Sequence, residues 1–423
     1  MTPAHAEPDD ALPRGFHRLI AAQFCSSLAD NALLIVVIAL LQSRALPGWW
    51  APMLKFSSTL SYVLLAPFVG ALADAMPKAR LMAWMNGLKV IALLGLMAGL
   101  NPLLCFAVLG CAASAYAPAK YGLVTELVAP RRLVTANAWI EVSVVCAVLL
   151  GAVLGGLLVS DGVLQRLAPL ISSAFGLTAP HGLWLSLAAL LVIYAGAALL
   201  NIGLPDSGAR YPLASRRPDT LSREFFAANR LLWRDRWGGL SLAVTTLFWG
   251  VGATLQFAVL RWASDALGLP LSQAATLQAA VALGVVVGAA WAGRSVALSR
   301  AHRVLPVGIV LGLAIALAAL VESRAAALAM LVLVGAVGGV LVVPMNALLQ
   351  HRGQQLLTAG RSIAVQNFNE NLSMLLMLAA YAGLLAIDTD IVRLMVLLGT
   401  AVALLVGLLL WHDRRWPLAL RAV

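Results

Sequence analysis

Five charged side chains fall inside long apolar stretches of this sequence: Asp30, Lys89, Lys120, Glu141 and Glu370. Asp30 and its neighbour Asn31 lie about 18 Å along a helix from Arg18, at about 1.5 Å per residue, which is close to the middle of a bilayer. A carboxylate there costs about 3 kcal/mol, so it needs a partner, a cavity or a substrate. Because other charges lie at similar depth, we favour a polar pathway; a buried ion pair or a hydrogen bond between helices is the alternative.

An amide-rich run surrounds Glu370. Gln366 and Glu370 are four residues apart, as are Asn367 and Asn371, so each pair shares one face of a helix. One pair could line a path while the other packs between helices. Carboxylates can receive a cationic group, and lysines can receive an anionic group such as phosphate. The charged and amide residues together predict a polar track with both charge signs.

Composition places these residues in a membrane. The chain has 423 residues, 61% of them hydrophobic and 11% charged, whereas soluble domains carry about 25% charged residues. Twelve apolar stretches are long enough to span a bilayer. They predict an all-α membrane protein with twelve transmembrane helices, at about residues 17–41, 53–74, 81–100, 103–126, 133–160, 182–203, 239–262, 272–293, 304–321, 325–349, 362–386 and 391–411.

The distribution of charge predicts the orientation. Most of the 29 lysines and arginines fall on one side of the predicted spans, which places both termini in the cytoplasm by the positive-inside rule. The net charge of +11 then reflects topology and attraction to anionic lipid, without nucleic acid. The first 15 residues contain no apolar signal-peptide core, so they predict a short cytoplasmic tail.

The longest break divides the spans six and six. We therefore expect five units: a tail at 1–15, six-helix bundles at 16–204 and 238–412, a cytoplasmic linker at 205–237, and a second tail at 413–423. Aromatic and leucine residues among arginines in the linker predict an amphipathic helix on the inner leaflet, and 161–181 is a second candidate for an interfacial helix. Three short matches recur in order 218 to 226 positions apart, which indicates a duplicated six-helix unit with the substrate site between the halves.

The loop between spans 2 and 3 reads GALADAMPKAR from residue 70 to 80. It resembles the signature loop of the major facilitator superfamily, Gly-x-Leu-x-Asp followed by a basic cluster. Gly70 permits close helix contact, Asp74 can cap a helix N-terminus or pair with a base, and Lys78 and Arg80 supply cations, so we predict a cytoplasmic gate. The usual Arg after the aspartate and the usual second Gly are absent, since Ala75 and Pro77 occupy those places, which predicts a weaker or differently arranged gate.

Five further motifs resemble the bacterial lysophospholipid transporter family, LplT, over nearly the whole chain. They are SLADNALL at 27–34, YAPAKYG at 116–122, FWG at 248–250, VPMNALLQ at 343–350 and IAVQNFNEN at 363–371. The resemblance implies a flippase of the bacterial inner membrane that moves lysophosphatidylethanolamine or lysophosphatidylglycerol to the inner leaflet. There a cytoplasmic-face acyltransferase and acyl-carrier-protein synthetase would reacylate it, and because the chain ends soon after span 12 we expect that partner to be a separate protein.

Such a substrate presents a phosphate, an ammonium or glycerol group, and one acyl chain. Asp30 or Glu370 could receive the ammonium and Lys120 the phosphate, while amides could bind the oxygens. The acyl chain could stay in lipid through an opening between the halves. The predicted substrate-binding residues are Asp30, Asn31, Tyr116, Lys120, Tyr121, Glu141, Gln256, Asn346, Gln366, Asn367 and Glu370; the predicted gating residues are Gly70, Asp74, Lys78, Arg80 and Glu126.

Several of these roles have alternatives. Lys120 lies near the cytoplasmic edge and could instead form an ion pair with Asp30 or Glu126. Lys89 could extend its amine to the inner interface. Relatives tend to carry Arg where this chain has Gln256, and Arg261 could substitute, although an interfacial anchor is the simpler role.

No catalytic group, metal site or cofactor site is predicted. The chain has no phosphate-binding Gly-x-x-x-x-Gly-Lys-Ser/Thr loop, and its histidines and four cysteines show no metal spacing. We expect a monomer that is not an enzyme. Two rival functions remain open, a drug or small-nutrient transporter of the same fold and a transport-inactive scaffold that recruits a lipid enzyme through the linker. Head-group preference and ion coupling also remain open.

Overall fold

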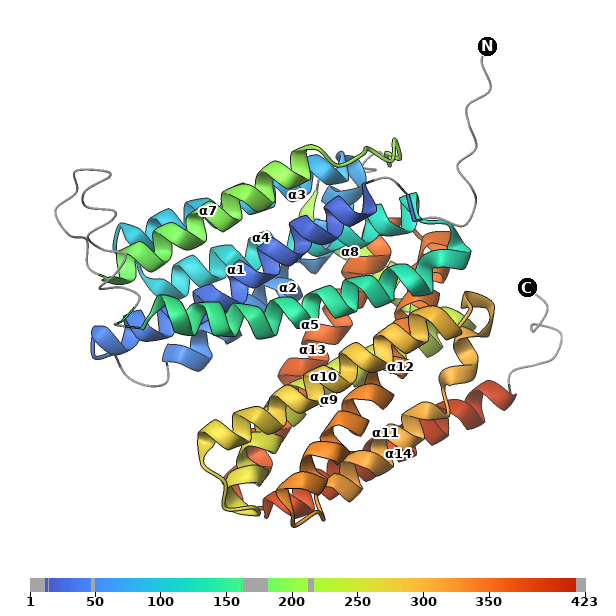
Figure 1. Ribbon diagram of the computed structural model, residues 1–423. Helices are drawn as coiled ribbons and strands as arrows, with labels where there is room; N and C mark the ends of the chain where they lie inside the picture. The colour runs from blue at the N-terminus through green and yellow to red at the C-terminus, as the bar shows by residue number, and fades with distance from the viewer. Residues whose placement is uncertain are drawn as a thin grey trace.

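The computed structural model describes residues 12–13, 15–46, 50–160, 162, 182–211 and 217–415, and their regular structure is entirely helical. The first half contains α1 (Phe16–Ser43), α2 (Trp50–Ala75), α3 (Lys78–Met97), α4 (Pro102–Leu127), α5 (Leu133–Leu158) and α7 (Gly182–Ile202). The second contains α9 (Arg236–Asp265), α10 (Leu271–Ser295), α11 (Val307–Ala318), α12 (Arg324–Leu356), α13 (Ala359–Ala386) and α14 (Ile391–Arg415). Figure 1 shows two bundles of long helices.

The twelve-span prediction agrees with the helices. Eleven are long and apolar enough to cross a membrane among the described residues, and a bent pair makes a twelfth. The span expected at 304–321 contains α11, and a 3₁₀ helix, Leu298–Val304, precedes α11 and meets it at an angle of 40°. Pro306 directly precedes α11, and because proline has no backbone N–H it cannot continue a helix from the preceding turn.

The linker contains the amphipathic helix that the sequence predicts, α8 (Pro218–Arg234). Proline at its first position and Asp219 in its first turn suit a helix N-terminus. Phe225, Ala228 and Leu232 are buried on one face, and Phe225 packs edge-on against Phe368 of α13 at 5.3 Å. The second predicted interfacial helix, at 161–181, lies outside the described residues except at residue 162, and the bounds of the five units stay predictions.

Helices α1 and α5 approach closely beside the Asp30 region because α5 carries glycines there. A Cβ on Gly151 would lie 2.7 Å from the Leu28 carbonyl oxygen and 2.9 Å from the Asn31 Cβ. A Cβ on Gly155 would lie 2.8 Å from the Ala32 carbonyl oxygen. Small residues allow such backbone contact between membrane helices, so these two glycines fix how α1 is held.

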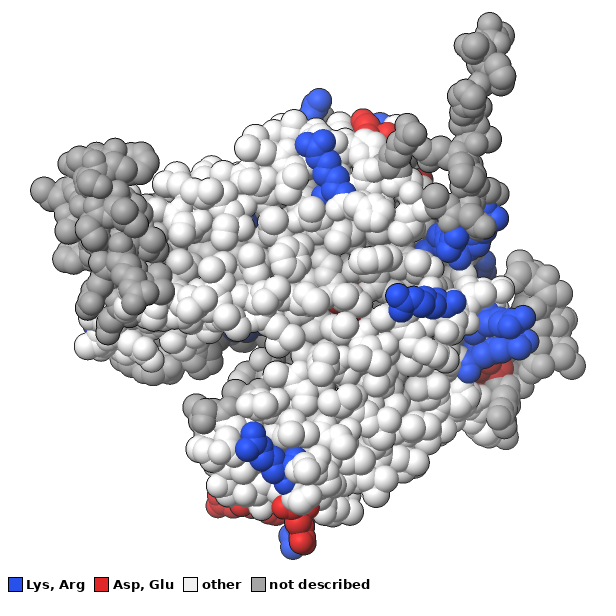
Figure 2. All heavy atoms as spheres, viewed as in Figure 1, with Lys and Arg blue, Asp and Glu red and all other residues white. Residues whose placement is uncertain are grey.

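The halves meet at one end and separate at the other (Figure 1). We call the end where α1 begins and α14 ends the inner end, which the charge pattern predicts to be cytoplasmic; Figure 2 shows many Lys and Arg side chains there. Asn137 and Gln350 exchange two hydrogen bonds across the halves near this end, at 2.8 and 2.9 Å. The Thr135 hydroxyl donates to the Gly293 carbonyl at 2.8 Å. A cleft between the halves opens at the opposite end (Figure 2), and the orientation predicted from the charge pattern makes this an outward-facing conformation.

We expect Gly151→Ala to destabilise the protein, because the added methyl group would press on the α1 backbone. Overpacking of this kind costs about 1–3 kcal/mol. Gly156→Ala, on an open face of the same helix, is the matched control, and it should be neutral or slightly stabilising because alanine favours helices. Thermal unfolding in detergent measures both. Equal melting temperatures for the two variants would contradict the close packing of α1 and α5.

Candidate functional site

Asp30 has a buried partner in the first half. The Lys89 amine of α3 lies 2.8 and 2.6 Å from the two Asp30 carboxylate oxygens, and the Tyr194 hydroxyl of α7 donates to Asp30 at 2.7 Å. Lys89 also donates to Ser26 at 3.0 Å, and Ser26 donates to Asn86 at 2.8 Å. The expectation that Lys89 reaches the inner interface is therefore wrong. Its side chain is 2% exposed, and its amine binds the Asp30 carboxylate instead of the more distant lipid head groups.

Asp30 nevertheless keeps an open side. Its side chain is 38% exposed. Tyr116 packs its ring 5.6 Å from the Lys89 amine, while Asn31 donates to the carbonyl of Ser27 in its own helix at 2.8 Å.

Lys120 lies apart from that ion pair. Its amine donates to the Gln23 side chain at 3.3 Å and sits 4.1 Å from the centre of the Tyr121 ring. The alternative in which Lys120 pairs with Glu126 is wrong, because Glu126 pairs with Lys78 at 2.6 Å. Asp30 is also occupied, by Lys89. Glu141 of α5 is the carboxylate that attracts Lys120 most strongly, but within the described part of the chain no carboxylate lies within ion-pairing distance of Lys120.

Across the interface, α12 and α13 present a linked polar set. The Gln366 amide donates to the Glu370 carboxylate at 2.8 Å and to Asn346 at 2.9 Å. All three side chains are buried. The second predicted pair behaves differently: Asn371 donates to the Asn367 carbonyl oxygen at 2.8 Å, within the helix. Thus one of the two amide faces joins a side-chain network between helices.

These two sets lie one helical turn beyond the closed contact between the halves. Asn137 and Glu141 are four apart on α5, as are Gln350 and Asn346 on α12, so each couple shares a helix face. Asn137 bonds Gln350 nearer the inner end, and Glu141 lies near enough to Glu370 and to Tyr121 for its charge to act on both. We call the polar residues above this contact the floor cluster: Lys120, Glu141, Asn346, Gln366 and Glu370.

Asp74, one of the predicted gating residues, joins the two halves at the inner end through the start of α13. Asp74 accepts hydrogen bonds from the backbone N–H groups of Gly360 at 2.8 Å and Arg361 at 3.1 Å, and from the Thr358 hydroxyl. A carboxylate at a helix N-terminus is stabilised by its unpaired N–H groups and dipole. A Cβ on Gly70 would already lie 2.8 Å from the Ala364 Cβ, so helices α2 and α13 are in close contact.

The cations of the signature loop act separately from Asp74. Lys78 is fully buried and pairs with Glu126 at 2.6 Å, and Glu126 also accepts from the Ser207 hydroxyl at 2.5 Å. Arg80 is exposed, and no partner for it is found among the residues described. Lys78 and Glu126 thus join α3 to α4 inside the first half, while Asp74 alone of these groups reaches the second half.

Gln256 and Arg261 lie away from the floor cluster. Gln256 is exposed on α9, and no hydrogen bond between it and the cluster occurs in the described ranges. Arg261 pairs with Asp265 at 3.0 Å, and both side chains are about half exposed. The pairing favours the anchor role for Arg261 over substitution for a cation in the path.

Comparison with known proteins agrees with this arrangement. The model of the Major Facilitator Superfamily matches residues 19–378. Relatives named "Lysophospholipid transporter LplT" include one from Serratia proteamaculans (strain 568), 39% identical over 383 residues that cover 90% of this chain and 91% of the relative. Another, from Enterobacter sp. (strain 638), is 39% identical over 404 residues, covering 95% of this chain and 97% of the relative. This chain belongs to the LplT family of the major facilitator superfamily.

Solved structures show the same fold at low identity. The human organic anion transporter MFSD10 has a TM-score of 0.71 at 16% identity, covering 95% of this chain and all of that one. The transporter FucP in its outward conformation has a TM-score of 0.72 at 16% identity, covering 94% and 98%. Membership of the LplT family thus rests on the sequence relatives, and these structures support the fold alone.

Sequence reasoning missed the groups that complete each network in this LplT-family chain. They are Gln23, Ser26, Asn86 and Tyr194 around the lysines, and Thr135, Asn137, Gln350, Thr358, Gly360 and Arg361 at the closed end. Thr358 lies in the sequence LLTA at 356–359, which repeats LVTA at 133–136 and is one of the three matches between the halves. That repeat carried a usable signal of a helix start. The remaining groups are single polar residues on apolar helices, and only their three-dimensional neighbours reveal their role.

We expect Asp30→Asn to destabilise the protein because it leaves the buried Lys89 amine without its counter-charge. Breaking one side of a buried pair costs about 3–5 kcal/mol, whereas replacing both partners is often tolerated. The double variant Asp30→Asn with Lys89→Met should therefore recover most of the lost thermal stability. A double variant less stable than Asp30→Asn alone would contradict the pairing.

Asp74→Asn should weaken the closed inner end, because the neutral amide loses its attraction to the start of α13. A charge at a helix terminus contributes about 0.5–2 kcal/mol, so the ratio of outward- to inward-facing molecules should fall between about two- and thirty-fold. Thiol labelling of Ser362→Cys, a buried position at the closed end, measures this in a background without native cysteines. Asp206→Asn, in an exposed pair with Arg210, is the control; equal labelling in both would contradict the gate.

Proposed function

We propose that this protein moves lysophospholipids from the outer to the inner leaflet of the bacterial inner membrane by alternating access. The relatives at 39–40% identity that carry the name lysophospholipid transporter support the substrate class. The observation that carries the mechanism is Lys120, a buried cation without an ion-pair partner among the described residues.

The floor cluster suits a head group with both charge signs. Lys120 would bind the phosphate, since a charge-assisted hydrogen bond to phosphate is stronger than a neutral one. Glu370 would receive an ammonium or glycerol group, with Gln366 and Asn346 donating to or accepting from its neighbouring oxygens. Glu370 is a better candidate than Asp30 for this role, because Lys89 and Tyr194 already satisfy Asp30. Asp30 then positions α1, α3 and α7 around the site.

Movement of the head group follows from the position of the closed contact. The Asn137–Gln350 hydrogen bonds lie one turn below Glu141 and Asn346, so a head group bound at the floor cluster touches the same two helices that must separate. Opening of the inner end also requires Asp74 to leave the start of α13. The acyl chain stays in lipid between the halves, because a polar cluster does not favour hydrocarbon.

The proposal includes the surroundings of the transporter. Both termini would lie in the cytoplasm, and the protein would act as a monomer in the inner membrane. A separate acyltransferase with acyl-carrier-protein synthetase activity would consume the lysolipid on arrival. Reacylation alone can then draw transport forward, without a coupling ion.

Lys120→Gln should reduce uptake of labelled lysophosphatidylethanolamine into acyltransferase-containing spheroplasts. Loss of a hydrogen bond to a charged group costs about 1.5–3 kcal/mol, so uptake at low substrate should fall between about ten- and hundred-fold. Lys120→Arg should retain much more, because it keeps the charge. Glu370→Gln should impair uptake of the ethanolamine lipid more than uptake of lysophosphatidylglycerol, which has no ammonium.

The control is Arg393→Gln, which removes an exposed cation at the outer end of α14. It should transport normally, and melting temperatures and expression of all variants are compared. Normal uptake by Lys120→Gln would overturn the assignment of Lys120 to the head group. Uptake that does not depend on the protein at all would overturn the transport function.

A further inference from the structure

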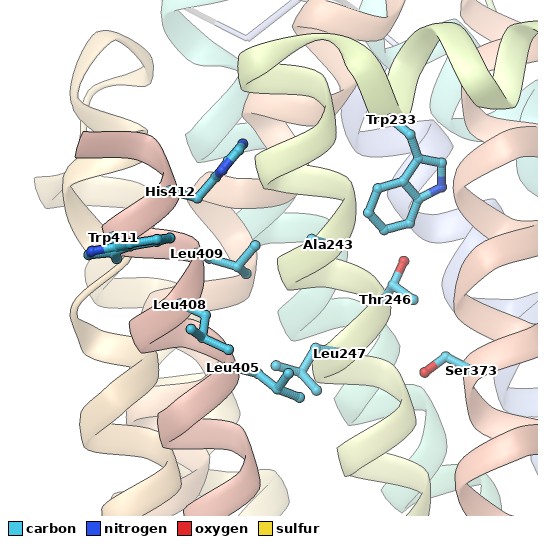
Figure 3. Close-up of a pocket in the computed structure, with 10 residues that line it drawn as sticks. All are labelled: Trp233, Ala243, Thr246, Leu247, Ser373, Leu405, Leu408, Leu409, Trp411 and His412. Carbon is cyan, nitrogen blue, oxygen red and sulfur yellow. The ribbon is translucent and has the colours of Figure 1, made fainter. Parts of the chain in front are cut away.

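A groove with a volume of about 480 Å³ lies on the second half, away from the interface between the halves. It is formed by α8, α9, α13 and α14, and Figure 3 shows Trp233, Leu247, Leu405 and Trp411 around it. Its lining is apolar except for the Thr246 and Ser373 hydroxyls and the two tryptophans and His412. No residue of the floor cluster lines this groove.

The depth of the groove corresponds to one leaflet. Leu247 lies eleven residues from the inner start of α9, or about 16 Å along the helix, and Leu405 lies about 15 Å from the inner end of α14. Half of a hydrocarbon core is about 15 Å thick. Leu405 is 47% exposed and Leu408 is 60% exposed, so the groove opens sideways toward lipid. Water is not a stable occupant of an apolar groove at hydrocarbon depth, whereas an acyl chain is.

The rim of the groove is built for the membrane interface. Trp233 belongs to the amphipathic helix α8, and its indole N–H donates to the Asn369 side chain at 3.1 Å, which fixes the ring against α13. Trp411 lies near the inner end of α14. Tryptophans concentrate at the level of lipid head groups, so the two rings mark where a head group attached to the chain would lie.

The charge at this rim is positive. Arg230 and Arg234 flank Trp233 on α8, are four residues apart and are exposed. No ion pair of either arginine is found within the described ranges. The nearby carboxylates are neutralised, because Asp235 pairs with Arg352 at 2.9 Å and Asp413 pairs with Arg236 at 2.8 Å. The surplus of two arginines therefore favours an anionic head group.

We propose that this groove binds one acyl chain of an anionic two-chain phospholipid of the inner leaflet, with its head group against Arg230 and Arg234. The site goes beyond transport, because its ligand is a resident lipid and not the transported lysolipid. Its occupant would pack α9 and α14 against α8. Trp233 of α8 in turn bonds Asn369 of α13, the residue next to Glu370.

The test uses the full-length protein in phosphatidylcholine nanodiscs that contain a trace of phosphatidylglycerol with a photoreactive diazirine in its chain. We expect saturable labelling of residues 243–247 and 405–412, with unlabelled phosphatidylglycerol competing and phosphatidylcholine not competing. Ala243→Trp, which fills the groove, should abolish the labelling. Ala401→Trp, at an exposed α14 position outside the groove, should leave it unchanged.

Arg230→Gln and Arg234→Gln should each weaken binding of the phosphatidylglycerol probe about five-fold, since a basic residue near an anionic surface contributes about 1 kcal/mol. These two positions are exposed, so the variants should fold normally even if Ala243→Trp does not. Labelling that does not saturate, that is equal for a phosphatidylcholine probe, or that keeps the same probe affinity in the arginine variants would overturn the proposal and leave only the ordinary lipid belt. None of these results bears on lysolipid uptake.

Discussion

The cost of placing charge in hydrocarbon governs the organisation of this protein. An unpaired charge at the centre of a spanning helix is expensive, so each charged residue at depth needs neighbours that satisfy it. Asp30, Lys89 and Tyr194 satisfy one another and thereby bring α1, α3 and α7 together. The glycines of α5 then allow a fourth helix to approach α1 closely. The first half is thus assembled around a paired charge, and the pairing leaves Lys120 as the cation without a carboxylate partner among the described residues.

The cost of unpaired charge also explains why the two halves present different polar groups to the interface between them. The first half presents Lys120 with an amide and an aromatic ring, and the second presents Glu370 within an amide network. Neither set neutralises the other, since their charges lie beyond ion-pairing distance in the outward-facing conformation. A ligand that carries both charge signs can satisfy both sets at once. Attraction of such a ligand to both Lys120 and Glu370 would therefore favour its binding and would also favour closure of the two halves over it.

Much of the fold was predictable from the sequence, because apolar length and charge asymmetry act locally. The twelve stretches, the amphipathic helix of the linker and the role of Asp74 at a helix N-terminus all follow from short windows of sequence. The 3₁₀ helix before α11 was not predicted, because its sequence, LSRAHRV at 298–304, is polar and short and carries no apolar pattern.

The site was less predictable, because partners in space are far apart in the chain. The partners of Asp30 come from two other helices, 59 and 164 residues away. Two alternatives were wrong for that reason, the pairing of Lys120 with Glu126 and the extension of Lys89 to the inner interface. The depth of a charge along its helix does not show which counter-charge faces it. The single amide residues at the closed end carry no periodic signal, so only the packed structure shows that Asn137 meets Gln350.

The contacts of α8 make the membrane itself a participant in the conformational equilibrium. Phe225, Ala228 and Leu232 share one apolar cluster with Val69 of α2 and Ala364 of α13, while Glu224 holds Arg361 at 2.8 Å. When the inner end opens, α2 and α13 must separate, and α8 can stay packed against only one of them. Apolar surface that was buried then meets the interfacial region of the bilayer. The lateral pressure and chain unsaturation of the inner leaflet should therefore set the balance between the two states.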